Sequence, residues 1–356
     1  MKTIACLFVL GMLGATVSTH AQQSDTPATP PPPKQTITGE AYFDYYYNIQ
    51  MRDTTKKDLN GFQVRRIYFT YDHSISPDFD ARMRLEADGK ELSTPGGKLT
   101  TFLKEAWMKW KNIFEGSDFI AGLSPTPAYD VSEAAWGYRS LEKTIMDLRG
   151  IAPRTDLSAD LKGKITGDGS LNYWAKIGDN SGQTPETDKY KRYYGSLHVK
   201  SGSQFQATAY ADLESEPGRL DAFDGQTKTN DRMTLAGFLN FRQPDEYSFG
   251  IEGFYHVTQN NLVTGPTTPL ENQNAFGVTA FAWGSVSDRL RLVGRFDAYN
   301  SNTAATKNAV YLFIGALDYM PVKDVHLMPN IWLQSYAADN VTSDVVARMT
   351  FNYVYR

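Results

Sequence analysis

Apolar and polar side chains alternate along most of the chain after residue 35. In residues 79–88 every odd-numbered residue is apolar and every even-numbered residue is charged. A period of two places the two kinds of side chain on opposite faces of an extended strand. The same period recurs in sixteen segments: 36–50, 64–73, 79–88, 104–111, 119–123, 156–164, 171–178, 192–200, 205–214, 232–242, 247–257, 274–284, 289–299, 309–319, 325–336 and 344–356. The pattern therefore predicts an all-β protein.

The connections between these segments alternate in length. Short connections of a few residues, such as 201–204 and 243–246, interleave with longer ones, such as 51–63 and 124–155. Strands of roughly ten residues are long enough to cross a bilayer when tilted, and outer-membrane barrels have short periplasmic turns and long extracellular loops. The alternation therefore predicts a transmembrane antiparallel up-and-down β-barrel of about sixteen strands.

The charges decide which face of each strand meets lipid. An arginine on the lipid face near the membrane midplane costs about 2–4 kcal/mol, so Arg82 and Arg84 are expected to point inward. A water-filled interior requires a wide barrel, as sixteen to eighteen strands give. A soluble β-sandwich also has alternating strands, but it seldom needs sixteen. We therefore expect an apolar outer face and an aqueous lumen.

Three segments fit less well and leave a strand count of fourteen or eighteen open. Residues 119–123 are short because Pro125 and Pro127 end them. Pro329 lies within 325–336, where a closed barrel offers no edge strand to accommodate it, so we expect a bulge or a strand that starts later. The segment 274–284 has apolar residues on both faces, so either face could meet lipid: Phe281 and Trp283 on one, Phe276 and Val278 on the other.

The N-terminus predicts export. Residues 1–21 have the features of a signal peptide, with an apolar stretch before Thr19-His20-Ala21, and residues 22–35 form a Pro-rich linker before a barrel over 36–356. The chain holds 21 Tyr and 19 Phe at a net charge of −4, which gives no reason to expect nucleic-acid binding. No later segment reaches 18 uninterrupted apolar residues, so no membrane-spanning helix is expected. Together these features predict the outer membrane of a Gram-negative bacterium.

Several stretches resemble the phosphate-selective porin O and P family. The likeness lies in 61–88 with its paired Arg65 and Arg66, and in 104–111, 119–133, 138–150, 290–300 and 325–336. It implies a homotrimeric sixteen-stranded porin whose third long loop, 124–155, folds inward as a constriction. Two features depart from the family. No lysine cluster stands out beside the arginines, and the chain ends in Tyr355-Arg356, where such barrels usually end on an aromatic residue.

Two groups of residues are candidates for the pore. The long third loop carries mixed charge that would set pore width and field, with the candidates Tyr129, Asp130, Glu133, Trp136, Arg139, Glu142 and Lys143. Five arginines of the predicted inward face could add a basic strip: Arg66, Arg82, Arg84, Arg291 and Arg295. The alternative, which the near balance of inward charges favours, is that opposite charges pair across neighbouring strands and hold the wall.

The predicted function is passive diffusion of small hydrophilic solutes or ions, with anions such as phosphate as one option. The alternative is a barrel without transport that acts through its loops as an adhesin or scaffold. An enzyme is not expected. Ser248 and His256 share one face of their strand but lie about 27 Å apart, too far for a catalytic pair. No cofactor or metal site is expected, and the expected partners are membrane lipid, solutes and two further copies of the chain.

Overall fold

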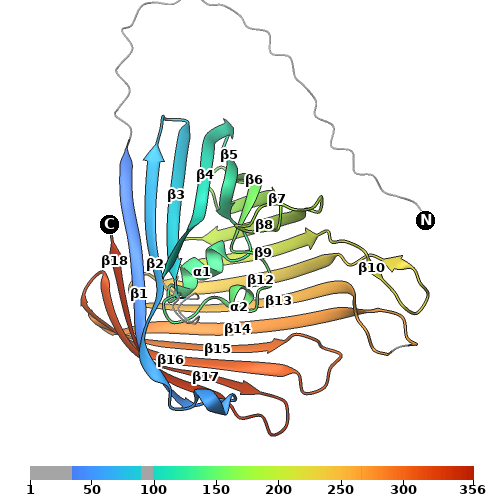
Figure 1. The fold of residues 1–356 in the computed structure, drawn as a ribbon. Coiled ribbons are helices and arrows are strands. Elements are labelled where there is room, and N and C mark those ends of the chain that lie inside the picture. The colour runs from blue at the N-terminus through green and yellow to red at the C-terminus, as the bar shows by residue number, and fades with distance from the viewer. Residues whose placement is uncertain (1–33, 90–98, 266) are drawn as a thin grey trace, which may run out of the picture. The chain divides into compact units, whose positions relative to one another are not determined.

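Sixteen strands form one closed antiparallel barrel in the computed structural model, which describes residues 34–89, 99–265 and 267–356 (Figure 1). The expected signal peptide 1–21 and nearly all of the linker 22–35 lie outside the described residues. Each strand pairs with its neighbours in the chain, and β1 pairs with β18 to close the barrel. The barrel strands are β1 (Gln35–Gln50), β2 (Asn60–Ser74), β3 (Phe79–Asp88), β4 (Thr100–Phe114), β5 (Ser117–Pro125), β6 (Thr155–Lys164), β7 (Leu171–Gly178), β8 (Arg192–Ser201), β9 (Phe205–Glu214), β12 (Arg232–Gln243), β13 (Tyr247–Leu262), β14 (Glu271–Ser287), β15 (Leu290–Asn300), β16 (Ala309–Val322), β17 (Val325–Tyr336) and β18 (Asp344–Tyr355).

All sixteen predicted strands are present, and the predicted fold class is confirmed. Short turns and longer connections alternate, as the sequence indicates, so we refer below to a short-turn end and a long-loop end of the barrel. One long connection carries the small hairpin β10 (Arg219–Leu220) and β11 (Thr227–Lys228), and another carries a 3₁₀ helix, Thr54–Lys56. The connection between β5 and β6 carries α1 (Asp130–Trp136) and α2 (Ile145–Leu148).

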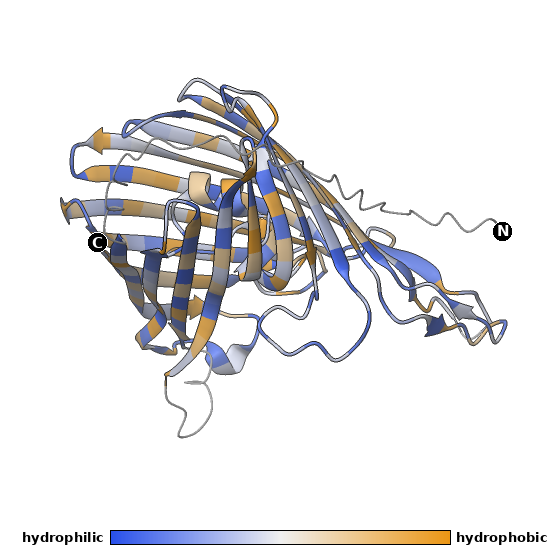
Figure 2. Cartoon of the chain, turned by 90° about the horizontal axis from the view of Figure 1, so that it is seen from above, coloured by the Kyte–Doolittle hydropathy of each residue, from blue (hydrophilic) through white to orange (hydrophobic). Residues whose placement is uncertain are grey.

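The outer face of the barrel is apolar. On β12, Leu235 and Leu239 are 50% and 54% exposed. Phe238 and Asn240, the two chain neighbours of Leu239, are buried on the inner face. Figure 2 shows the resulting bands of apolar and polar residues along the strands. An apolar surface that encircles a barrel is stable only against lipid. None of the helices in the described part of the chain is long and apolar enough to span a membrane.

The structure settles the open segments. Segment 119–123 belongs to β5, a complete strand over Ser117–Pro125. Pro329 lies inside β17, which begins at Val325, and stays in register with Met349 of β18, so the expected bulge or later start at Pro329 is wrong. Toward β16 the ladder is interrupted between the pairs Ala316↔Asn330 and Tyr319↔Leu327, because proline has no N–H to donate. On β14, Phe276 is 47% exposed on the outer face and Phe281 only 4% exposed on the inner face, so Phe276 belongs to the lipid side.

Candidate functional site

The connection between β5 and β6 folds into the barrel and lies along its inner wall (Figure 1). Helix α1 contacts β12 and β13, and α2 contacts β14. Gly137 ends α1 with φ +68°, and its N–H donates to the Glu133 carbonyl at 3.0 Å. This left-handed conformation favours glycine, which closes the helix and redirects the chain. The loop over 124–155 therefore lies inside the lumen, as the family resemblance implies.

An apolar patch on the inner wall holds α1. Trp136 is fully buried, and its ring centroid lies 5.2 Å from that of Phe281. The patch consists of inward-facing residues from five strands: Phe238, Phe281, Val293, Leu312, Ile314, Ala316 and Met328. The prediction that the whole inner face meets water is wrong here. These side chains would be unfavourable in water, and burying each large one against the helix contributes about 1.5–3 kcal/mol.

A second apolar contact fixes the two ends of the loop. Tyr129, Ile145 and Met146 are buried, and they pack against inward-facing aromatic residues of β8, β9 and β13: Tyr194, Tyr210 and Phe254. The Tyr129 hydroxyl donates to the Ala152 carbonyl, which joins the start of the loop to its end. Tyr129 and Trp136 were predicted to project into the pore. Both instead lie in the packed base of the loop, because large aromatic side chains are more stable against the wall than in water.

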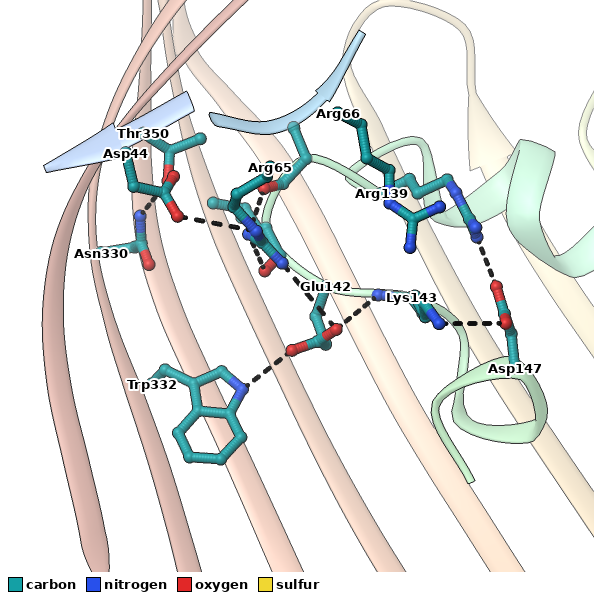
Figure 3. Close-up of polar contacts among 12 residues, drawn as sticks. Asp44, Arg65, Arg66, Arg139, Glu142, Lys143, Asp147, Asn330, Trp332 and Thr350 are labelled. Carbon is teal, nitrogen blue, oxygen red and sulfur yellow. Dashed lines mark hydrogen bonds and ion pairs between the residues drawn. The ribbon is translucent and has the colours of Figure 1, made fainter. Parts of the chain in front are cut away.

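Polar contacts fasten the middle of the loop to strands on either side of the barrel closure (Figure 3). The Arg65 guanidinium of β2 donates to the carbonyls of Ser140 and Leu141 at 2.7 and 2.9 Å. The Trp332 indole of β17 donates to the Glu142 carboxylate at 3.1 Å. Each contact satisfies a polar group that the folded loop would otherwise bury without a partner. The loop is therefore held in one position across several strands.

Two further contacts come from β15 and β16. The Tyr138 hydroxyl donates to Asp318 at 3.0 Å. Arg295 pairs with Asp297 at 2.7 Å and also donates to the Lys143 carbonyl. Arg295 was predicted to be a pore residue, and the structure places its guanidinium between the wall and the loop.

An ion-pair cluster stabilises the loop internally. Arg139 pairs with Glu133 and, at 2.6 Å, with Asp147, and Arg154 pairs with Glu133 at 2.8 Å. Burial by itself raises the pKa of Glu133, but Arg154 and Arg139 outweigh it and lower that pKa below its usual range. Burial likewise opposes ionisation of Asp147, yet Arg139 and Lys143 lower its pKa to about 2. Both carboxylates are therefore ionised at neutral pH.

The depressed pKa of Asp147 predicts acid sensitivity of the loop. A shift of the Asp147 pKa from its ordinary value of 3.8 to about 2 corresponds to about 2 kcal/mol. Because the folded pKa is lowered, this stability is present above pH ~4 and is lost as the pH falls from about 4 to about 2. We expect single-channel current noise to be constant between pH 5 and 7 and to rise below pH 4. Asp147→Asn should show the added noise already at pH 7, and an identical trace for both proteins at every pH would contradict this.

Arg139 lines two cavities, one on each side of its side chain along the wall of β1 to β4. The cavity at the long-loop side has a volume of about 480 Å³, and the other has about 340 Å³. The first is also lined by Arg65, Arg66, Glu142 and Lys143, and the second by Arg84, Lys104, Glu105, Glu133 and Arg154. A solute that moved from one of these cavities to the other would pass Arg139. This point is the candidate constriction.

Cations face the water on this wall, and their carboxylate partners lie behind them. The side chain of Arg84 is 27% exposed, but that of its partner Glu105 at 2.8 Å is 2% exposed. Lys104 is 12% exposed, against 1% for its partner Glu86 at 3.0 Å. A water-exposed cation acts on a passing solute more strongly than a carboxylate farther away and behind it. The passage therefore presents positive charge although the pairs are formally neutral.

The cross-strand pairing that we favoured is present for three wall arginines: Arg66 with Glu86, Arg82 with Asp72 and Arg84 with Glu105. The alternative of one continuous basic strip is wrong, because β15 lies six strands from β3 around the barrel. On β15, Arg291 lies over the Trp283 ring at 4.5 Å. Among the loop candidates, Asp130 pairs with Lys162 at 3.2 Å, and Lys143 pairs with Asp147 at 3.5 Å.

Two wall cations were missed because bulges turn them inward. Arg65 is the extra residue between the pairs Tyr42↔Arg66 and Phe43↔Val64. Lys104 is the extra residue between Arg84↔Glu105 and Leu85↔Leu103. The sequence carried a signal for both, since Arg65-Arg66 and Lys104-Glu105 are adjacent charged pairs. In a regular strand one member of each pair would face lipid, so adjacency itself indicates a bulge.

Similar structures share the whole barrel. No family model and no curated protein matches the chain. Many solved structures do match. Among them is the outer-membrane channel DcaP of Acinetobacter baumannii, with 13% sequence identity and a TM-score of 0.64 over 91% of this chain and 97% of that one. Others are an anion-selective porin from Comamonas acidovorans (10% identity, TM-score 0.65, 91% and 100%) and the outer-membrane protein OmpT of Vibrio cholerae in its trimer form (10% identity, TM-score 0.60, 91% and 99%).

The protein is an outer-membrane β-barrel with the porin fold. At these identities the comparisons establish the fold, and the apolar belt around the closed barrel supplies the physical reason for its place in a membrane. Such barrels belong to the outer membrane of Gram-negative bacteria, which is the predicted location.

Proposed function

We propose that the barrel is a porin for passive diffusion of small hydrophilic solutes and that it favours anions. The observation that carries this proposal is the wall beside Arg139, where Arg84 and Lys104 face the water and their carboxylates are buried. A solute that carries negative charge gains attraction along this path, and a cation is repelled by the same groups. No chemical step is involved, so we propose a channel and not an enzyme.

Reversal potentials in a planar bilayer with a KCl gradient test the proposal. We expect the reversal potential to have the sign of the chloride equilibrium potential. We also expect Lys104→Gln to reduce the chloride-to-potassium permeability ratio. A unit charge about 6 Å from the ion contributes about 0.7 kcal/mol in water, so the reduction should be about threefold. The matched control is Lys307→Gln, whose lysine lies in a connection at the long-loop end. A cation-selective reversal potential would refute the anion preference, and absence of conductance would refute the porin.

Two finer features belong to this proposal. We propose that the functional unit is a homotrimer, which the family resemblance suggests and the trimer form of the Vibrio cholerae protein supports. We also keep phosphate among the anions to be tested, because the resemblance to phosphate-selective porins concerns the pattern of the strands and loop. Chemical cross-linking of the detergent-solubilised protein tests the first, and conductance in potassium phosphate tests the second.

A further inference from the structure

A third charged cavity lies at the short-turn end of the barrel, in addition to the two cavities that Arg139 lines. It has a volume of about 660 Å³, and residues of the turns, including Gly116 and Gly202, are part of its lining. Helix α1 contributes Val131 and Ala134 to the same lining. We call this cavity the vestibule. Its charged lining comprises six cations and two carboxylates: Arg82, Lys109, Lys162, Lys164, Lys200 and Arg242 with Asp118 and Asp130.

The vestibule contains the lysine cluster that the sequence did not reveal. Its lysines come from β4, β6 and β8, which are far apart in the chain, so no local stretch is rich in lysine. Only the closure of the barrel places them around one space. No lysine cluster therefore stands out in the sequence, although the structure contains one.

Three of the vestibule cations form no ion pair within the part of the chain that the structure describes. They are Lys164 on β6, Lys200 on β8 and Arg242 on β12. Each is two strands from the next around the barrel, which corresponds to about 10 Å at the usual strand spacing. By contrast, Lys162 pairs with Asp130 at 3.2 Å, and Lys109 lies 4.0 Å from Asp118. The vestibule therefore carries uncompensated positive charge on one side.

Apolar surface borders these cations. The Lys162 ammonium lies 3.8 Å from the centroid of the Trp174 ring, and Lys109 lies 5.7 Å from that of Trp107. These contacts place the ammonium groups over aromatic rings in addition to their carboxylate partners. Ile120 of β5, with Val131 and Ala134 of α1, adds aliphatic lining. A ligand in the vestibule would therefore meet free cationic donors and apolar side chains together.

We propose that the vestibule is a binding site for organic anions that carry an acidic group on a compact apolar body. The inference deepens the proposed porin function, on which it rests, by naming the class of solute that the channel retains at its short-turn end. A small inorganic anion would leave the apolar side chains exposed to water. A neutral apolar molecule would leave the three cations without a carboxylate or other anionic partner. An organic anion satisfies both parts of the lining.

Isothermal titration calorimetry of the detergent-solubilised protein tests the site directly. The probes are benzoate, inorganic phosphate and benzyl alcohol, which match the organic anion, the anionic group alone and the apolar body alone. We expect benzoate to bind at least about tenfold more tightly than the other two, a difference of about 1.4 kcal/mol. Binding of phosphate or benzyl alcohol as tight as that of benzoate would overturn the inference.

Variants separate the two halves of the site. The double variant Lys164→Gln/Lys200→Gln removes two cations and should weaken benzoate binding about tenfold. Val131→Thr keeps the shape of the side chain but makes it more polar. It should weaken benzoate binding and leave the phosphate affinity unchanged. Lys307→Gln, far from the vestibule lining, is the matched control. Unchanged benzoate affinity in the double variant would overturn the inference.

Conductance measured on the same preparation distinguishes this inference from the porin proposal. A conducting barrel that does not bind benzoate leaves the porin proposal intact and refutes the vestibule site. A barrel that binds benzoate with the expected preference but shows no conductance supports the site and refutes the porin.

Discussion

Replacing Trp136 with alanine is expected to release the inner loop and to make the channel current noisy, with frequent openings to a higher conductance. Trp136 is fully buried against Phe281 and the inner apolar patch, so the truncation should cost about 3–5 kcal/mol. That cost falls on docking of the loop, because the barrel ladder does not pass through this residue. A loss of this size raises the undocked population by about two to four orders of magnitude.

The measurement is single-channel recording in a planar bilayer, with circular dichroism to show that the β-structure is retained. Trp110→Ala is the matched control, because Trp110 lies on the outer face, 44% exposed, and should leave the current unchanged. A quiet trace with the wild-type conductance in a folded Trp136→Ala barrel would show that the loop does not occupy the conducting path.

Placing arginine on the lipid face is expected to destabilise the barrel strongly. Leu239 on β12 is 54% exposed on the outer face, and Leu239→Arg should cost about 2–4 kcal/mol, since the charge would lie in hydrocarbon. Thr208→Arg is the control. Thr208 of β9 pairs with Phe238, the inner-face neighbour of Leu239, so its side chain points to the lumen.

Urea titrations of the refolded barrel in lipid vesicles measure both variants. We expect a clear loss of unfolding free energy for Leu239→Arg and little change for Thr208→Arg. Equal losses in the two variants would contradict the assignment of lipid and lumen faces, on which the anion path and the vestibule depend.

The wall and the inner loop contribute different charged groups to the proposed channel. The wall supplies cations whose carboxylates are buried behind them, as at Arg84 and Glu105. The loop supplies Arg139, which its own carboxylates hold in place at the junction of two cavities. In the proposed channel the wall pairs serve both stability and selectivity, because each pair has a buried carboxylate and a more exposed cation.

The sequence by itself determined the strands, the lipid face of most of them and the up-and-down order. Segments 79–88, 205–214 and 325–336 have the predicted bounds in the structure, because a period of two and the turn residues between strands are local properties of the chain. The adjacent charges Arg65-Arg66 and Lys104-Glu105 also indicate the two bulges, because a regular strand would turn one residue of each pair toward lipid.

The tertiary structure alone decided what each inward-facing side chain meets. Alternation shows that Phe238, Leu312 and Ile314 share the face opposite lipid, but it cannot show that α1 covers them. Likewise Lys164, Lys200 and Arg242 surround one vestibule only because the closed sheet sets strands from distant parts of the chain side by side. The period of a strand reports the direction of a side chain, whereas its surroundings depend on contacts between segments far apart in sequence.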